Sequence, residues 1–149
     1  MVQNRKNLLK NTDDLIEAFD KISKVFASME SFTDGISLSK PEILALELIS
    51  NKEGVIMSET ADELDISFSM ATKIADFLVE KKLVVRNSNS EDRRIVELAL
   101  TEAGKNIVLE YKKQKKIYFG KMLELLSENE QKVFIKVLEK IAKAMRQDK

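Results

Sequence analysis

The sequence predicts a mainly helical, α+β fold, and two observations carry that prediction. The 149 residues include only four Gly and one Pro, so the chain has few of the residues that punctuate a β protein with many turns. Apolar residues recur at helical spacing through most of the chain. With 44% hydrophobic residues, a chain of this length can bury a core as a single domain.

The composition also excludes several classes of protein. The chain has no Cys and no His, which removes disulfides, thiolate nucleophiles, redox thiols, imidazole bases and the usual zinc ligands. We therefore expect no enzyme, no cofactor and no metal site. Charged residues make up 34% of the chain and interrupt every apolar run, so we expect no membrane span and no signal peptide. A cytoplasmic protein is the expected result.

The first third of the chain predicts two helices. Apolar residues at spacings of three and four mark an amphipathic helix from Leu8 to about Glu30. Ser39 and Glu42 form a capping box that begins a second helix. This helix ends near residues 51–54 and is apolar nearly all round, so we expect it to be buried.

Two short helices are expected next. Ser58 is expected to cap a third helix that ends at Leu64, and Ser67 to cap a fourth from Phe68 to Lys82. Asp65, between them, tolerates a left-handed turn. Two short helices joined by a tight turn form a helix-turn-helix.

The spacing of apolar residues then changes from that of a helix to that of two β-strands, which predicts a β-hairpin. Residues 83–85 are a short β-prone run, and residues 95–100 alternate in a way typical of a strand. The polar segment 86–94 between them is rich in turn-forming residues and ends in two arginines. A helix-turn-helix followed by such a hairpin is a winged helix, whose second short helix can enter the DNA major groove.

Two more helices complete the chain. Thr101 is expected to cap a fifth helix that runs to about Leu125 and carries four lysines between residues 112 and 116. Ser127 and Glu130 form a second capping box, which begins a sixth helix with an apolar stripe almost to the end of the chain.

These elements predict one domain over residues 1–149 with two regions. A winged helix-turn-helix lobe is expected at about 38–101, and helical dimerisation regions at about 5–35 and 102–147. The terminal apolar stripes exceed what such a small lobe can cover, so they need a partner surface. A two-fold homodimer would provide it; an intramolecular helical subdomain is the alternative.

Several motifs of the lobe carry a family resemblance. The specific ones are the wing motif Glu91–Arg94 and the motif Leu100–Lys105, which begins the fifth helix; Ala61–Leu64, Ser67–Lys73 and Leu78–Arg86 add the helix-turn-helix pattern. Through these motifs the sequence resembles the MarR family of bacterial winged-helix transcription regulators. The order of the flanking helices extends the resemblance to nearly the whole chain.

Three positions depart from the family pattern. Thr60-Ala61 stands where Leu-Ala is usual, and Asp65 and Lys82 stand where Gly is usual. Asp65 can adopt the left-handed turn that Gly would make, whereas Lys82 requires strain or a different cap.

The resemblance implies that the helix from Ser67 to Lys82 is a recognition helix. A helix amino end offers free N–H groups to phosphate, and hydroxyl and ammonium groups there can reach phosphates or base edges. The alternative is that the serines only cap the helix and Lys73 is solvated. The residues predicted to bind DNA, including those of the wing, are Ser67, Ser69, Met70, Thr72, Lys73, Arg86, Arg93 and Arg94.

The resemblance also implies a role for the wing. Arg94 is the first candidate for insertion into the minor groove, whose negative potential attracts arginine. Asp92 is expected to hold the following arginine side chain in place, and Arg86 to touch phosphate or to pair with Asp92. The alternative is a solvated, salt-bridged hairpin tip.

Charge supports this interpretation only locally. The chain has 25 basic and 25 acidic residues, so its net charge of zero does not favour nucleic acid. Residues 73–94 carry six basic and four acidic residues, and the third helix carries four acids over residues 59–65. The lysines of 112–116 either reach distant phosphates or form a solvated helix face.

The sequence thus predicts a dimeric, sequence-specific regulator of transcription, acting as a repressor on a palindromic operator in double-stranded DNA. The alternative is a helical winged-helix module that binds a protein and not DNA. The resemblance further implies release by a small amphipathic or aromatic ligand, although aromatic residues at helical spacing are more often core. The pocket predicted for such a ligand is lined by Phe26, Tyr111, Tyr118 and Phe119.

Overall fold

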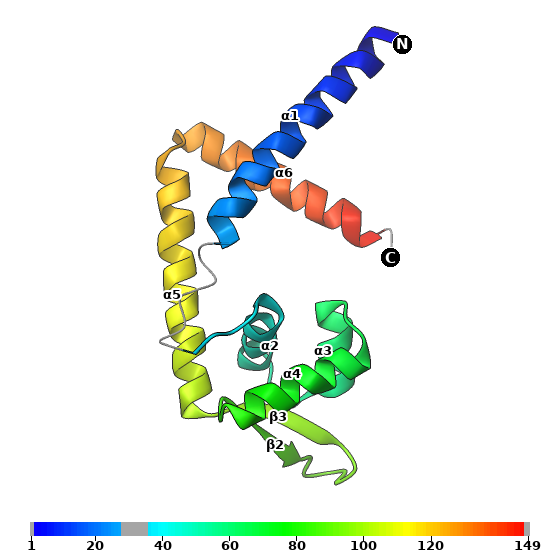
Figure 1. Cartoon of the computed structure of the whole chain (residues 1–149), viewed down its shortest axis with the longest axis vertical. Helices are drawn as coiled ribbons and strands as arrows, with labels where there is room; N and C mark the ends of the chain where they lie inside the picture. Colours follow the sequence, from blue (N-terminus) through cyan, green and yellow to red (C-terminus); the bar gives the residue numbers. More distant parts are fainter. Residues whose placement is uncertain (1, 28–35, 148–149) are drawn as a thin grey trace. The chain divides into compact units, whose positions relative to one another are not determined.

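The computed structural model describes the backbone of residues 2–27 and 36–147 and the side chains of residues 5–25 and 36–145. The chain divides into two compact units, Met1–Glu110 and Tyr111–Lys149, so the expectation of one folded unit stays a prediction. The mainly helical, winged-helix fold class is confirmed (Figure 1). The elements are α1 (Val2–Ala27), α2 (Lys40–Asn51), β1 (Val55–Ile56), α3 (Met57–Leu64), α4 (Phe68–Glu80), β2 (Val84–Ser88), β3 (Val96–Leu100), α5 (Glu102–Glu124) and α6 (Glu128–Gln147).

The winged-helix lobe holds the buried core of the first unit. Its sheet has the order β1-β3-β2 with antiparallel pairing, so β3 is the central strand. Register joins Val55 to Leu98 and Val84 to Leu100. The buried hydrophobic residues, each at most 6% exposed, are Leu38, Ile43, Ala45, Leu46, Ile49, Val55, Ala61, Ala71, Ile74, Ala75, Leu78, Leu83, Val84 and Leu98 of the lobe and Val108 of α5; Thr60, a polar residue of the lobe, is 1% exposed.

Most of the predicted helix caps are confirmed. The Ser39 amide donates to the Glu42 carboxylate at 2.6 Å, and Ser67 Oγ accepts from the Met70 amide at 3.1 Å. At the start of α5, Thr101 Oγ1 accepts from the Gly104 amide at 3.0 Å. Each bond satisfies a first-turn N–H or the capping residue's own amide.

The prediction that Ser58 caps the third helix is wrong. Helix α3 begins at Met57, directly after β1, and its cap residue is Ile56. The Ile56 amide donates to Glu59 Oε2 at 3.2 Å, so a carboxylate three residues later satisfies this amide. Because the strand leads into the helix without a loop, Ser58 lies inside the first turn.

The two positions where Gly is usual both adopt a left-handed backbone. Asp65 has φ 54° and ends α3, and Lys82 has φ 58°. The predicted recognition helix to Lys82 is therefore too long, because α4 ends at Glu80. A left-handed residue turns the chain so that the Leu83 amide donates back to the Leu78 carbonyl at 2.9 Å. A lysine in this conformation costs roughly 1 to 2 kcal/mol.

The motif Leu100–Lys105 closes the lobe. Thr101 Oγ1 donates to the Lys82 carbonyl at 2.7 Å, and the Thr101 amide donates to the Leu83 carbonyl at 3.0 Å. A Cβ on Gly104 would lie 2.1 Å from the Leu83 carbonyl oxygen. Only glycine allows this approach, so the motif fixes the start of α5 against the turn that follows α4.

The terminal helices leave apolar side chains exposed. In α1, Leu15, Ile16 and Phe19 are more than half exposed; residues 28–30 of the predicted first helix lie outside the described residues. In α6, the apolar stripe that includes Val137 and Ile141 is about half exposed. The Ser127–Glu130 capping box that begins α6 is confirmed, with bonds of 2.7 Å and 2.8 Å to the carboxylate. None of the described helices is both long and apolar enough to cross a membrane.

Candidate nucleic-acid interface

The amino end of α4 presents an exposed face. Its buried side is made by Ala71, Ile74, Ala75 and Leu78, which leaves Ser69 and Lys73 in solvent on the opposite side. Ser67 is occupied as the helix cap, and Thr72 Oγ1 donates to the Phe68 carbonyl at 2.9 Å. Ser69 and Lys73 are therefore the predicted polar residues of α4 best placed to meet a ligand.

Phe68 is a surface residue that sequence reasoning missed. The side chain is 60% exposed, and Met70 beside it is 43% exposed. Phe68 lies three residues before Ala71 and seven before Ala75, so helical spacing places it at the edge of the buried face and gives no signal of its exposure. Phe68 is not among the residues predicted to bind DNA, whereas Met70 is.

The wing is organised by Asn89. Its Oδ1 accepts from the Glu91 amide at 2.8 Å and from the Asp92 amide at 3.0 Å. Its Nδ2 donates to the Glu97 carboxylate on β3, and its amide donates to the Ile95 carbonyl at 2.9 Å. One side chain thus fixes both the start of the tip and its attachment to the sheet. The sequence signalled a turn here but not these partners.

Asp92 continues this chain of hydrogen bonds. Asp92 Oδ1 accepts from the Arg94 amide at 2.9 Å, and the Asp92 carbonyl accepts from the Ile95 amide at 3.0 Å. We expected Asp92 to hold an arginine side chain, but in the structure it holds the main chain of Arg94. The physical reason is proximity, since an Asp side chain readily bonds the amide two residues later.

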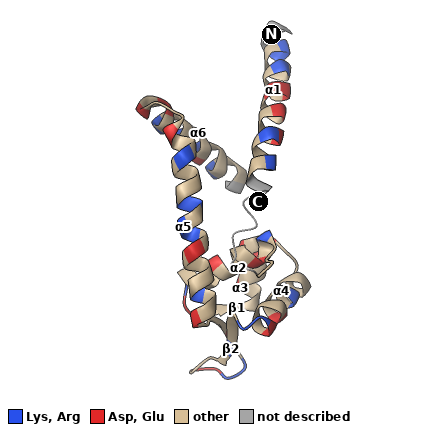
Figure 2. Ribbon diagram, turned by 60° about the vertical axis from the view of Figure 1, so that its left-hand side comes forward, with Lys and Arg blue, Asp and Glu red and all other residues tan. Residues whose placement is uncertain are grey.

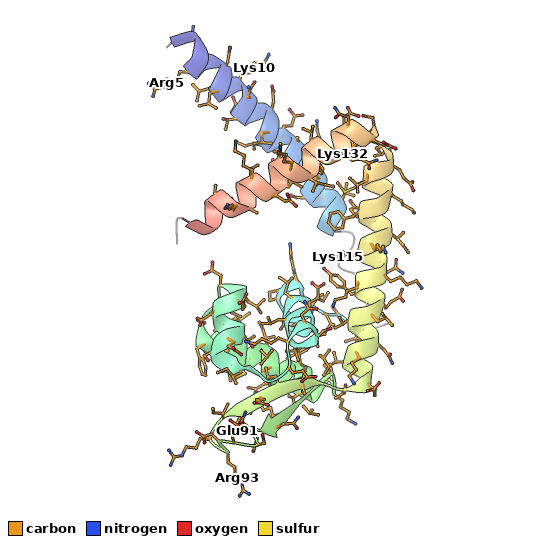
Figure 3. The ribbon with its side chains drawn as sticks, turned by 180° about the vertical axis from the view of Figure 1, so that it is seen from behind. Arg5, Lys10, Glu91, Arg93, Lys115 and Lys132 are labelled. Carbon is orange, nitrogen blue, oxygen red and sulfur yellow. The ribbon has the colours of Figure 1, made fainter. Side chains whose placement is uncertain are left out.

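Arg93 and Arg94 extend from this ordered tip. Both side chains are exposed, and Figure 3 shows Arg93 pointing from the hairpin away from the rest of the lobe. Across residues 5–25 and 36–145, whose side chains are described, neither arginine takes part in an ion pair. The backbone is fixed while both guanidinium groups are available, an arrangement suited to meeting a negatively charged surface.

Arg86 differs from its expected placement. Strand β2 extends to Ser88, so Arg86 lies within the strand and not in the tip loop. Its Nη2 lies 2.7 Å from Asp76 Oδ1 on α4, and so its partner is Asp76 and not Asp92. The side chains of Arg86 and Asp76 are 37% and 57% exposed, so solvent screens the pair. It nevertheless ties α4 to the wing strand β2.

The charge around this face is mixed, and Figure 2 shows acidic and basic segments together in the wing. Acidic residues of α3 lie nearby in the sequence, and Glu59 among them is paired with Lys52. The hydrogen bonds from the Lys52 ammonium and the Ile56 amide hold the pKa of Glu59 below its ordinary value. Glu59 is therefore ionised at neutral pH.

A hollow of about 150 Å³ lies between α2, β1 and α3. Its lining includes none of the residues predicted to bind a small ligand. The residues that line the hollow are Leu48, Lys52, Val55, Glu59, Asp62 and Glu63.

The four aromatic residues predicted to form a ligand pocket are described only in part. The rings of Tyr118 and Phe119 meet edge to face with centroids 5.9 Å apart, and Lys115 Nζ lies 5.4 Å from the centre of the Tyr111 ring. The side chain of Phe26 lies outside the described residues. The ligand pocket stays a prediction.

Comparison with known proteins decides the family. The model of the MarR family matches residues 38–96, which contain the helix-turn-helix and most of the wing. The "Uncharacterized HTH-type transcriptional regulator YpoP" of Bacillus subtilis is 30% identical over 125 residues, which are 82% of this chain and 89% of YpoP. The chain belongs to the MarR family.

Two further matches place this MarR-family chain among regulators. The HTH-type transcriptional repressor MdtR of Bacillus subtilis is 28% identical over 107 residues, covering 72% of this chain and 69% of MdtR. The crystal structure of Streptococcus pneumoniae FabT in complex with DNA matches with a TM-score of 0.85 and 25% identity, covering 93% of this chain and 99% of FabT. The chain is a transcription regulator and not an enzyme, as predicted.

Proposed function

We propose that this MarR-family protein is a dimeric, sequence-specific DNA-binding regulator that represses transcription from a palindromic operator. The observation that carries the proposal is the wing, in which hydrogen bonds hold the backbone of the tip and two exposed arginines extend from it, on the same lobe as the exposed amino end of α4. The FabT structure, which matches nearly the whole chain, contains DNA. MdtR, another relative, is named a repressor.

The proposed role of α4 is to enter the major groove. The first-turn amides of Phe68 and Ser69 have no partner within the helix and can donate to a phosphate. Ser69 and Lys73 are exposed on the same side, where a hydroxyl and an ammonium group can reach base edges or phosphates. Arg86 keeps α4 in register with the wing through Asp76.

The proposed role of the wing is to insert Arg94 into the minor groove. Asn89 and Asp92 hold the main chain of the tip, so less conformational entropy is lost when the guanidinium group binds. A narrow minor groove concentrates negative potential, and arginine reads this shape. Arg93 would meet the neighbouring phosphates.

The proposed dimer explains the exposed apolar stripes of the terminal helices. Leu15 and Phe19 of α1 and Ile141 of α6 are about half exposed or more. Because full burial of an exposed side chain of this kind contributes about 1.5 to 3 kcal/mol, covering the remaining half contributes roughly 1 kcal/mol each. A second copy would cover these stripes and supply a second recognition helix. Two such helices read successive major grooves when they lie about 34 Å apart.

The decisive experiment is selection of bound duplexes from a random DNA pool with the purified protein. We expect a palindromic site whose half-sites are about one helical turn apart. The logarithm of the affinity should fall with the logarithm of salt concentration at a slope of about 0.9 per phosphate contacted. Failure to bind any duplex at low ionic strength would contradict the proposal and favour a protein-binding module.

Arginine variants test the wing directly. Arg94→Ala should weaken binding to the selected site by about 1 to 3 kcal/mol, because a minor-groove contact is lost. Glu91→Ala in the same tip is the matched control and should strengthen binding, because it removes a negative charge. Equal affinities of the wild type and Arg94→Ala in a titration would exclude the proposed insertion.

A further inference from the structure

Two apolar side chains lie exposed at the amino end of α4. Phe68 is 60% exposed and Met70 is 43% exposed. The buried face of this helix is already complete, because Ala71, Ile74, Ala75 and Leu78 are at most 3% exposed and fill it. Neither Phe68 nor Met70 therefore contributes to the core of the lobe, and both are available to a ligand.

The polar groups around them offer few hydrogen bonds for reading bases. Ser67 Oγ is occupied by the Met70 amide, and the Thr72 hydroxyl donates to the Phe68 carbonyl. Ser69 and Lys73 are the remaining exposed polar residues of the first two turns. The amino end of α4 thus presents two exposed apolar side chains and only two exposed polar side chains that no hydrogen bond within the helix occupies.

We infer that Phe68 and Met70 read thymine by contact with its C5-methyl group. Among the major-groove edges of the four bases, only thymine presents a methyl group, and apolar side chains recognise it. The inference rests on the proposed function and adds a specificity to it: each half-site contains thymine at the positions that face the first turn of α4.

The surroundings favour DNA over an apolar protein surface as the partner of these side chains. They flank Ser69, lie on the same end of α4 as Lys73, and are held by a helix whose unpaired first-turn amides attract phosphate. An apolar patch made for a protein would be larger than two side chains with a hydroxyl and an ammonium group beside them.

The test uses a duplex that carries the selected site, with single thymines replaced by uracil. This replacement removes the methyl group and keeps every hydrogen-bonding group of the base. Burial of one methyl group contributes about 0.8 kcal/mol, so we expect wild-type affinity to fall about fourfold for each contacted thymine. Replacement of thymines outside the half-sites provides the control.

Variants then assign the methyl contact to a residue. Phe68→Ala should bind the thymine and uracil duplexes equally at one position of the half-site, and Met70→Ala should do so at another. Phe68→Leu, which keeps an apolar side chain, should retain the preference for thymine. A double-mutant cycle that combines the thymine-to-uracil change with the residue change isolates the energy of the contact. Thermal unfolding confirms that each variant is folded.

Three results would overturn the inference. The first is a selected site that lacks thymine in its half-sites, and the second is equal wild-type affinity for the thymine and uracil duplexes. The third is Phe68→Ala and Met70→Ala proteins that bind more weakly but keep the wild-type ratio between these duplexes. All three leave the proposed function intact, since that function fails if no duplex is bound or if no site is preferred. The second result comes from wild-type protein alone and depends on the folding of no variant.

Discussion

Helices α4 and α6 carry similar apolar periodicity but have opposite surroundings. In α4, Ile74 and Leu78 are 3% and 0% exposed, whereas Val137 and Ile141 of α6 are 47% and 49% exposed. Periodicity therefore shows that a helix has an apolar face without showing what covers it. The lobe covers its own faces, and we propose that the terminal helices depend on a second chain.

The largest expected effect concerns α4, whose apolar face is buried within the lobe. Leu78→Ala removes a side chain that is fully buried in the lobe, and we expect it to lower the free energy of unfolding by about 3 to 5 kcal/mol. Denaturant unfolding measures this loss. The difference from wild type should be the same at low and high protein concentration, because the cavity lies within one chain; a loss that grows on dilution would show that the lobe core depends on the dimer.

The next largest effect concerns α6, whose apolar stripe is about half exposed. Ile141→Glu places a carboxylate in the apolar stripe of α6, and burying it unpaired in a dimer interface should raise the dimer dissociation constant by about a hundredfold or more. Sedimentation equilibrium measures this constant. Lys143→Glu, on the charged side of the same helix, is the control and should leave dissociation nearly unchanged. An Ile141→Glu protein as dimeric as wild type would show that this stripe is not the interface.

Features that depend on residues close together in the sequence could be predicted, whereas features that join distant residues could not. The caps at Ser67 and Thr101 and the left-handed turn at Asp65 were predictable, because each depends on residues within one helical turn. The pair of Arg86 with Asp76 joins two elements, and no local pattern encodes it. The sequence therefore predicted the fold class and the position of the wing, but not what holds the wing and α4 together.

Strand β1 shows the same limit. Its two residues form a strand only because Val55 and Ile56 pair with Leu98 and Glu97 of β3, and this strand moved the start of α3 to Met57. Phe68 was missed for a related reason, since exposure depends on where the rest of the lobe ends. The candidate functional surface is therefore determined more by contacts between residues far apart in the sequence than by the individual helices and strands.

A smaller effect is expected just after the end of α4, where a substitution should raise the free energy of unfolding and not lower it. Lys82 has φ 58°, and Lys82→Gly should raise the free energy of unfolding of the lobe by about 0.5 to 1 kcal/mol, because relief of the strain exceeds the entropy cost of glycine. Lys81→Gly is the matched control: its φ of −75° suits any residue, so this substitution should not stabilise the protein. Chemical denaturation measures both, and equal effects would show that φ at Lys82 carries no strain.

The smallest effect compares one helix cap from each region. Bonds from the Lys52 ammonium and the Ile56 amide lower the pKa of Glu59, and bonds from the Ser127 hydroxyl and amide lower the pKa of Glu130, both below the ordinary value of 4.5. Because the folded pKa is depressed, each carboxylate stabilises the protein fully above pH 4.5. This contribution disappears as the pH falls through the lowered folded value.

Glu59→Gln and Glu130→Gln should therefore each flatten the fall in unfolding free energy that the wild type shows on acidification. Salt separates the two caps. The largest cause at Glu59 is the bond from the ammonium of Lys52, which is exposed and screened, whereas both bonds at Glu130 come from the uncharged Ser127. At high salt the difference between wild type and Glu59→Gln should shrink while that for Glu130→Gln persists. If salt changed both differences in unfolding free energy equally, the pairing of Lys52 with Glu59 would contribute nothing to the cap of α3. That cap would then depend only on hydrogen bonds between neighbouring residues, as the cap of α6 does.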